Sequence, residues 1–342
     1  MSNYVLRRTY YFFLTMTAWA LAACASSSDC FREEVFCAAL VTDTQGVEDH
    51  GINQDAWVGL QQAKDNDLAD QVDVIESVDS RDYLKNIAYF ADRGYDIIFT
   101  AGIALEDATL QSADLAPDSV FAGLNQAFAE SRPNLISITF PEDQMGFAAG
   151  VSAVRLTNTG SVAAICETSG IDAMRRTCEG FRAGVQYANE AGQTNVKASV
   201  IYRENGDREK LFMDEAWGYE TANDLIRRGV DVIFAAGGGT GQGALKAASD
   251  FGVYALGAER DQGAALADSG LSVVASFYGQ ARLEVQEALR DVRAGKGDEI
   301  RVGLVQFTSL GPLFPQEWSG ELALLLAELH AGNIQTGVEI SR

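Results

Sequence analysis

Two stretches of the chain, "RGYDIIFTAGIAL" (residues 93–105) and "RGVDVIFAAGGGTG" (residues 228–241), repeat one pattern. Each runs from the end of a helical segment through a Gly and an Asp into an apolar run and then a Gly-containing turn. The runs are apolar at consecutive positions, which is typical of parallel strands buried on both faces. Each is followed by another helix and another strand, "SVFAGLN" (119–125) and "GVYALGAE" (252–259). The duplication predicts two similar α/β units.

The rest of the chain alternates short apolar runs with amphipathic stretches, which predicts βαβ units with helices on both faces of parallel sheets. The expected strands are Phe36–Thr42, Val72–Val78, Asp96–Ala101, Val120–Leu124, Leu135–Phe140, Val162–Glu167, Val196–Tyr202, Val230–Ala236, Val253–Ala258, Ser272–Phe277 and Arg301–Phe307. Helical patterns separate them, and a last one covers Gln316–Ala331. With 342 residues the chain has room for two units with cores of their own.

The N-terminus has the features of an export signal over residues 1–23. Arg7 and Arg8 precede an apolar segment, Tyr10–Ala20, that is too short to span a bilayer as a mature helix. The following "LAAC" resembles a bacterial lipobox, which implies cleavage before Cys24 and acylation of that residue. A plain secretory signal or an uncleaved anchor is the alternative. We predict an exported, membrane-anchored lipoprotein facing the periplasm or cell exterior, with residues 24–35 as a flexible tether.

The charge and the cysteines restrict the class of protein further. The formal net charge is −22, or −24 without the two arginines of the signal, which excludes a nucleic-acid partner because phosphate contacts need clustered Lys and Arg. Besides Cys24 the chain has four cysteines, and three pairings are possible. We favour the local pairs Cys30–Cys37 and Cys166–Cys178, because each closes a short loop in an oxidising compartment. With two histidines and no C-x-x-C, we predict no metal site.

Several spaced motifs together resemble one family. They are "VTDTQGVEDHGIN", "RGYDIIFTAG", "PDSVFAGLN", "RPNLISITFPEDQMGFAAGVSAV", "CEGFRAGV", "RGVDVIFAAGGGTGQGALKAA" and "GAERDQ". In this order, from about residue 36 to about residue 295, they resemble the basic membrane protein family, the lipid-anchored substrate-binding components of ABC importers typified by purine-nucleoside receptors. The resemblance implies a small-molecule ligand, ABC permease subunits as partners, and no cofactor.

The resemblance also implies an architecture, the type I periplasmic-binding-protein fold. In that fold two Rossmann-like lobes are joined by a three-segment hinge and enclose a ligand cleft. The crossings are expected near Phe140, Ser276 and Gly303. The N-terminal lobe would comprise residues 36–140 and 277–302, and the C-terminal lobe residues 141–276 and 303–342.

The resemblance places candidate ligand contacts at the carboxyl ends of strands. Asp43, Gly46, Asp49 and Asn53 match the family's opening motif, and we expect Asn53 to cap the helix that begins at Gln54. Asp49 is expected only to hold its loop in place. Other positions depart from the family, because a Phe is replaced by Ile52, an Asp by Asn125, an Asp by Glu259, and a Lys by Tyr278. The predicted ligand-binding residues are Asp43, Asn53, Asn125, Tyr202, Gly237, Gly238, Glu259 and Tyr278.

These residues suit an uncharged, nucleoside-like or heteroaromatic ligand. The loop "AAGGGTGQGALKAA" lacks the P-loop ending and the dinucleotide spacing, so we interpret Gly237 and Gly238 as points of close backbone approach to a ligand, or as a tight strand-to-helix turn. A riboflavin-binding protein and a small-molecule sensor lipoprotein are the alternatives. An enzyme such as a nucleoside hydrolase is disfavoured, because no G-x-S-x-G is present and nothing positions the acidic residues for catalysis.

Overall fold

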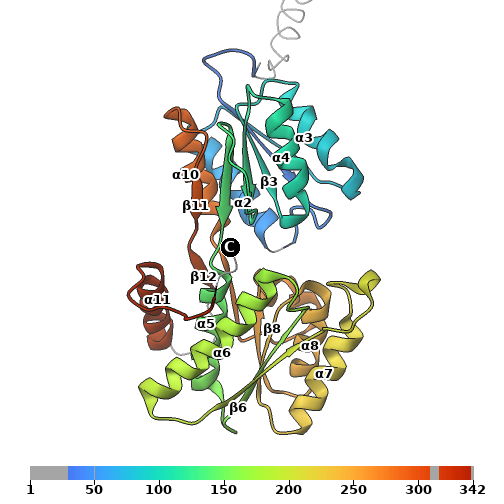
Figure 1. Ribbon diagram of the computed structural model, residues 1–342, viewed down its shortest axis with the longest axis vertical. Coiled ribbons are helices and arrows are strands. Elements are labelled where there is room, and N and C mark those ends of the chain that lie inside the picture. The colour runs from blue at the N-terminus through green and yellow to red at the C-terminus, as the bar shows by residue number, and fades with distance from the viewer. Residues whose placement is uncertain (1–29, 50, 309–315, 340–342) are drawn as a thin grey trace, which may run out of the picture.

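The computed structural model describes residues 30–49, 51–308 and 316–339. Two lobes lie one above the other along the longest axis of the molecule (Figure 1). The predicted signal peptide, Cys24 and the first part of the predicted tether lie outside the described residues.

The order of elements follows the alternation expected from the sequence. The strands are β1 (Cys37–Thr42), β2 (Gln71–Ile75), β3 (Ile97–Ala101), β4 (Val120–Leu124), β5 (Leu135–Thr139), β6 (Ser161–Cys166), β7 (Lys197–Tyr202), β8 (Val232–Ala235), β9 (Tyr254–Ala258), β10 (Ala275–Gly279), β11 (Ile300–Val302) and β12 (Val305–Phe307). The α-helices are α2 (Ile52–Asp65), α3 (Tyr83–Ala91), α4 (Glu106–Leu115), α5 (Glu142–Leu156), α6 (Asp172–Gly192), α7 (Glu215–Arg227), α8 (Gly238–Asp250), α9 (Gln262–Ala265), α10 (Ala281–Arg293) and α11 (Gln316–His330).

Each lobe is built on a six-stranded sheet. The strand order is β11-β5-β4-β3-β1-β2 in the first lobe and β12-β10-β9-β8-β6-β7 in the second. All neighbouring strands are parallel except β10 and β12. The repeated sequence pattern occupies equivalent places, since β3 and β8 are inner strands of the two sheets. The predicted α/β fold with two Rossmann-like lobes is therefore confirmed.

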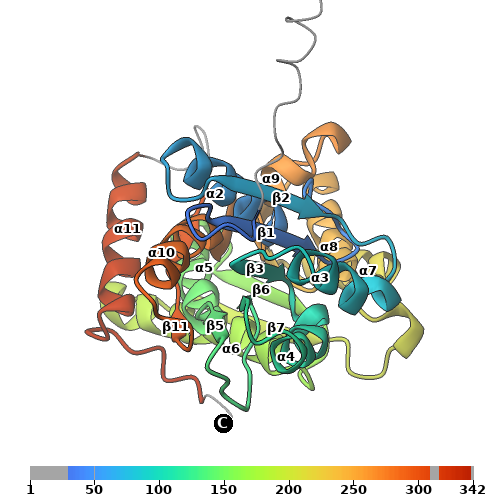
Figure 2. The same cartoon turned by 90° about the horizontal axis from the view of Figure 1, so that it is seen from above.

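Both faces of each sheet are covered, which explains the apolar runs. Along β1, Ala38 and Leu40 belong to one apolar cluster, and Ala39 and Val41 belong to another. Successive side chains of a strand point to opposite faces, so each face has a core of its own. Figure 2 shows α2 and α10 on one side of the first sheet and α3 and α4 on the other, in agreement with their contacts.

The chain passes between the sheets three times, after β5, after β10 and between β11 and β12. The passages meet at Phe140, because a Cβ added to Gly279 or Gly303 would lie within 2.5 Å of its ring. The single strand predicted for Arg301–Phe307 is wrong, because the chain changes sheets near Gly303 and so forms β11 in one lobe and β12 in the other. The second passage comes after Gly279, slightly later than predicted, because β10 pairs with β12 over its whole second half.

Glycines allow α5 and α6 to pack unusually closely in the second lobe. A Cβ added to Gly146 of α5 would lie 1.8 Å from the carbonyl oxygen of Thr177 in α6. In the other direction, a Cβ on Gly180 would lie 2.2 Å from the carbonyl oxygen of Asp143, and one on Gly184 would lie 2.0 Å from that of Phe147. These helices therefore touch through their backbones.

Both locally closed disulfides are present. Cys30 bonds Cys37 at the start of β1, and Cys166 at the end of β6 bonds Cys178 in α6. The first bridge shows that residues 30–35 of the predicted tether are fastened to the first lobe. Among the described residues, no helix combines the length and the apolar character needed to cross a membrane.

Candidate functional site

The candidate site lies where the parallel strands of both sheets end. Asp43 follows β1 in the first lobe, and Glu259 follows β9 in the second. The loops that follow these two strands touch, because Nη1 of Arg260 donates a hydrogen bond of 2.6 Å to the carbonyl oxygen of Asp49. Ligands of open α/β sheets bind at this edge.

Asp43 and Asn53 form a pair at the end of β1. The Asn53 Nδ2 donates to Asp43 Oδ1 at 2.8 Å, and the Gln45 N–H donates to the same oxygen at 2.9 Å. The hydrogen bonds on this carboxylate come from neutral amides, and burial raises the pKa of Asp43. Such a carboxylate is suited to accept hydrogen bonds from hydroxyl or N–H groups of a ligand.

Asn53 is fully buried, yet its Oδ1 has no hydrogen-bond donor within the part of the chain that the structure describes. The bond from Nδ2 to Asp43 determines the orientation of the amide, since the reverse orientation would place two oxygens against each other. A buried acceptor without a donor carries an energetic penalty until water or a ligand supplies one.

The capping role expected for Asn53 is wrong. Helix α2 begins at Ile52, and Asn53 lies inside its first turn. The Asp49 carboxylate instead accepts from the backbone N–H groups of Gly51, Asn53 and Gln54 at 2.8–3.2 Å. Asp49 can do this because it precedes the helix and carries two acceptor oxygens.

Asn125 and Glu259 occupy equivalent positions after β4 and β9, and both have left-handed backbones, with φ of 59° and 71°. Non-glycine residues adopt this conformation at an energetic cost and concentrate at functional sites. Gly102 and Gly237, after β3 and β8, likewise have positive φ, of 99° and 106°. The residues that follow equivalent strands of the two lobes therefore share a positive φ angle.

Gly237 and Gly238 form an amide nest at the start of α8. Their N–H groups donate to Glu259 Oε1 at 2.9 Å and Oε2 at 3.1 Å. A helix N-terminus of this kind normally attracts a phosphate or another anion. Here the protein supplies its own carboxylate. The two glycines therefore make a tight strand-to-helix turn, in which a Cβ on Gly237 would lie 2.7 Å from the Cβ of Glu167.

A buried ionic network supports this edge of the second lobe. Arg203, only 3% exposed, donates to Glu167 Oε1 at 3.1 Å and to Asp214 Oδ2 at 3.0 Å. The other oxygen of Glu167 accepts from the Phe212 N–H at 3.0 Å and from the Thr240 hydroxyl at 2.7 Å. The network thus connects the end of β6, the loop after β7 and the first turn of α8.

Neither Arg203 nor Phe212 is predicted from the sequence to belong to the site. An arginine after a strand is usually exposed, and only its partners reveal the buried role. Phe212 has a left-handed backbone, with φ of 61°, which is a genuine outlier for a bulky residue, and its carbonyl oxygen accepts from the Gly239 N–H at 2.8 Å. It lies in the loop between β7 and α7.

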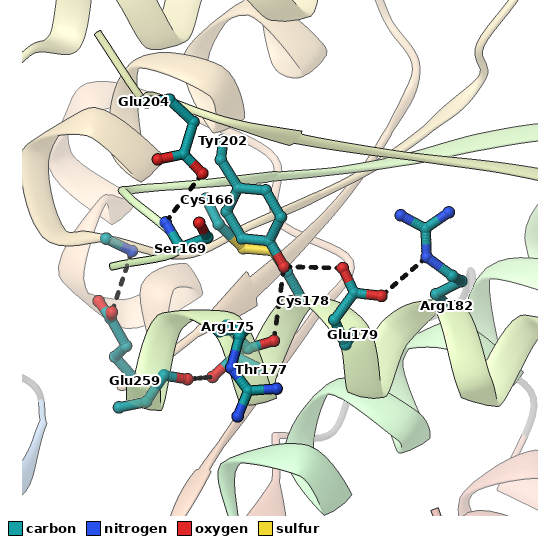
Figure 3. The surroundings of a disulfide bond; sticks show 12 residues. Cys166, Ser169, Arg175, Thr177, Cys178, Glu179, Arg182, Tyr202, Glu204 and Glu259 are labelled. Carbon is teal, nitrogen blue, oxygen red and sulfur yellow. Dashed lines mark hydrogen bonds and ion pairs between the residues drawn. A yellow bond between two sulfur atoms is a disulfide. The ribbon is translucent and has the colours of Figure 1, made fainter. Parts of the chain in front are cut away.

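The predicted ligand-binding residue Tyr202 lies at the end of β7 and contacts α6. Its hydroxyl donates to Glu179 Oε1 in α6 at 2.9 Å, beside the Cys166–Cys178 disulfide (Figure 3). Burial, followed by the bond to Glu179, raises the pKa of Tyr202. The strand alternation directs this side chain to the face covered by α6.

Tyr278 lies in β10 close to the crossings, and it is half-buried. Burial and the nearby charges of Asp261 and Asp55 raise its pKa to about 12, so the phenol is neutral at physiological pH. Asp261 belongs to the second lobe and Asp55 to the first, which places this ring between them. The neighbouring Phe277 is fully buried.

Within the described ranges, no cluster of three or more His, Cys, Asp or Glu side chains is arranged to hold a metal ion.

Comparison with known sequences connects this architecture to a family. A model of the family described as ABC transporter substrate-binding protein PnrA-like matches residues 36–304. The chain is 32% identical over 276 residues to the CD4+ T-cell-stimulating antigen of Listeria innocua, which covers 75% of this chain and 74% of that protein. It is 29% identical over 236 residues to the ABC transporter nucleoside-binding protein BmpA of Lactococcus lactis subsp. cremoris, covering 66% and 64%.

Solved structures share the fold at lower identity. An ABC transporter solute-binding protein from Conexibacter woesei aligns with a TM-score of 0.68 at 22% identity, covering 88% of this chain and 98% of that one. A solute-binding protein from Aeropyrum pernix K1 aligns with a TM-score of 0.67 at 20% identity, covering 88% and 92%. These structures establish the two-lobed solute-binding fold.

Proposed function

The chain belongs to the family of PnrA-like ABC transporter substrate-binding proteins, and from this membership we propose that it captures an uncharged, nucleoside-like or heteroaromatic molecule between its lobes. Membership implies a small-molecule ligand and permease partners. Proteins of this family bind substrates and are generally not enzymes.

The observation that carries the proposal is the Asp43–Asn53 pair. The carboxylate has neutral donors, and the buried Asn53 Oδ1 has no donor among the described residues. Together they present acceptors to a ligand rich in hydroxyl or N–H groups, such as a ribosyl or heteroaromatic compound. The nucleoside-binding relative from Lactococcus lactis supports the same class of ligand.

The second lobe supports an uncharged ligand rather than a phosphorylated one. Glu259 already occupies the amide nest of Gly237 and Gly238, and its carboxylate would repel a phosphate brought to the same edge. Tyr278 stands where the family resemblance leads us to expect a lysine, so this position offers no cation. We therefore propose that nucleosides are accepted and nucleotides are rejected.

The experiment is a thermal-shift panel followed by calorimetry on the purified chain. The panel contains guanosine, inosine, uridine, adenine, riboflavin, ribose and guanosine monophosphate. We expect shifts with nucleosides or heteroaromatic compounds and none with the monophosphate. Shifts with ribose alone would refute the proposed ligand class, and a riboflavin shift without nucleoside shifts would identify a flavin-binding member.

Variants connect binding to the proposed residues. Asp43→Asn is expected to weaken binding of the best ligand at least tenfold. Asp96→Asn is the matched control, because Asp96 is also a half-buried carboxylate whose pKa is raised by burial, and it bonds the Cys37 N–H at 2.7 Å at the opposite edge of the same sheet. Equal losses in both variants would show that the effect does not come from a ligand contact of Asp43.

Export and lipid anchoring belong to the same proposal. We propose that Cys24 is acylated and holds the protein at the membrane, facing the periplasm or cell exterior. Replacing Cys24 by Ala should release the protein from the membrane fraction of cells, and unchanged fractionation together with an unmodified Cys24 by mass spectrometry would contradict it.

A further inference from the structure

Arg260 makes a direct hydrogen bond between the two lobes. It follows β9 in the second lobe, and its Nη1 lies 2.6 Å from the carbonyl oxygen of Asp49, 211 residues away in the loop between β1 and α2. The same two segments approach each other closely, because a Cβ added to Gly51 would lie 3.0 Å from the Cβ of Arg260.

The backbone around Arg260 is held rigidly in the second lobe. Glu259 has a left-handed backbone, its N–H donates to the Phe277 carbonyl oxygen at 3.2 Å, and its carboxylate is bound by the glycine nest. The N–H of Arg260 donates to the Ala258 carbonyl oxygen at 2.8 Å. These hydrogen bonds therefore fix the backbone from which the Arg260 side chain extends to the first lobe.

The acceptor is equally well fixed in the first lobe. The Asp49 side chain, 7% exposed, accepts from three backbone N–H groups at the start of α2. One of them belongs to Asn53, whose side chain bonds Asp43. Any displacement of the Asp49 carbonyl should therefore also displace the short, hydrogen-bonded segment that connects it to the residues proposed to bind the ligand.

Arg260 is chemically suited to a contact that forms and breaks. Its side chain makes no ion pair within 4 Å in the ranges that the structure describes, so this guanidinium bonds a neutral carbonyl. A charge-assisted bond to a carbonyl is stronger than a neutral one, yet it leaves no buried carboxylate unpaired when the lobes separate.

We propose that Arg260 is a positioning residue that latches the loop between Asp43 and Asn53 against the second lobe, so that a bound ligand is retained. This inference rests on the proposed function, because it assumes that the ligand lies between the lobes. Arg260 itself is assigned no contact with the ligand. Its effect should therefore fall on the rate of ligand release more than on the rate of capture.

The test compares Arg260→Ala and Arg260→Lys with a matched control, Arg293→Ala. Arg293 also donates its Nη1 to an aspartate carbonyl, that of Asp67, at 2.8 Å, but both residues belong to the first lobe. In the ligand-free full chain, hydrogen–deuterium exchange at Gly51, Asn53 and Gln54 should be faster in Arg260→Ala than in the wild type and unchanged in Arg293→Ala.

Stopped-flow binding of guanosine, inosine and riboflavin supplies the second readout. For whichever probe the wild type binds, Arg260→Ala should release it about tenfold faster with a capture rate changed less than twofold, and Arg260→Lys should recover part of the loss. Unchanged exchange, or an unchanged release rate, would overturn the latch. If the wild type binds none of these probes, the proposed function fails, and the exchange experiment still decides whether the latch exists.

Discussion

Replacing Arg203 by Met gives a sharp test of the ionic network that supports the edge of the second lobe. The guanidinium of Arg203 is buried against Glu167, which is fully buried, and against Asp214. Met has a similar length and fills much of the same space, so the change removes charge and hydrogen bonds while leaving little cavity. Glu167 would remain in the interior without its cation.

The expected cost follows from these surroundings. Removing one partner of a buried ion pair typically destabilises a protein by about 3–5 kcal/mol, because the other charge is left uncompensated. Glu167 keeps its bonds to the Phe212 N–H and the Thr240 hydroxyl, so we expect the lower end, about 3 kcal/mol. For a unit of 150–250 residues this corresponds to a fall of roughly 6–12 °C in the Tm of the second lobe.

The assay is urea unfolding and calorimetry at pH 7. Arg182→Met is the control, because Arg182 forms a half-exposed surface pair with Glu179, and its loss should cost less than about 1 kcal/mol. In a double-mutant cycle, Arg203→Met combined with Glu167→Gln should be less damaging than the sum of the single changes, because the fully buried charge of Glu167 is removed together with its cation. If Arg203→Met were no more destabilising than Arg182→Met, the network would not support this edge.

Three further predictions concern stability. Burial raises the pKa of Asp43, so the folded state binds its proton more tightly than the unfolded state, and stability falls as pH rises through the folded pKa. Asp43→Asn should therefore be more stable than the wild type at pH 7, with the difference vanishing towards about pH 4 in urea titrations; a constant difference would contradict this. Gly146→Ala should lower the free energy of unfolding by at least about 1–3 kcal/mol, because the added methyl group forces α5 away from α6. Gly320→Ala is the control in α11, where the added methyl group meets open space, and it should raise the free energy of unfolding by up to about 1 kcal/mol. Replacing both Cys166 and Cys178 by Ser should cost about 2–5 kcal/mol by calorimetry, and an unchanged Tm would show that the bridge is dispensable.

Much of the fold is predictable from the sequence, because it depends on local pattern. The apolar runs around Ile98 and Ile233 indicate strands buried on both faces, and both are inner strands of their sheets. The exchange of sheets between β11 and β12 is not predictable from the apolar pattern alone. Gly303 is the only turn-forming residue within Arg301–Phe307, and which sheet each half joins depends on partners far away in the chain.

The candidate site is harder to predict for a related reason. The end of β1 identifies Asp43, but its pairing with Asn53 depends on how the loop folds back over α2. The bond of Tyr202 to Glu179 of α6 is not predictable, because the pattern of a strand shows that faces alternate and does not show which face α6 covers. Arg203 is missed because a charged residue after a strand resembles an exposed one until its partners Glu167 and Asp214 are known.

The Cys30–Cys37 disulfide determines how far the body of the protein can stand from a membrane. If Cys24 carries a lipid, six peptide steps separate it from Cys30, a span of at most about 20 Å when fully extended. Without the bridge, the unattached part of the chain would extend from Cys24 to Cys37, and its longest possible span would rise to about 45 Å. Because Cys37 and Asp43 lie at opposite ends of β1, the bridge would hold the Cys37 end of that strand near the bilayer and keep the edge proposed to bind the ligand turned away from it.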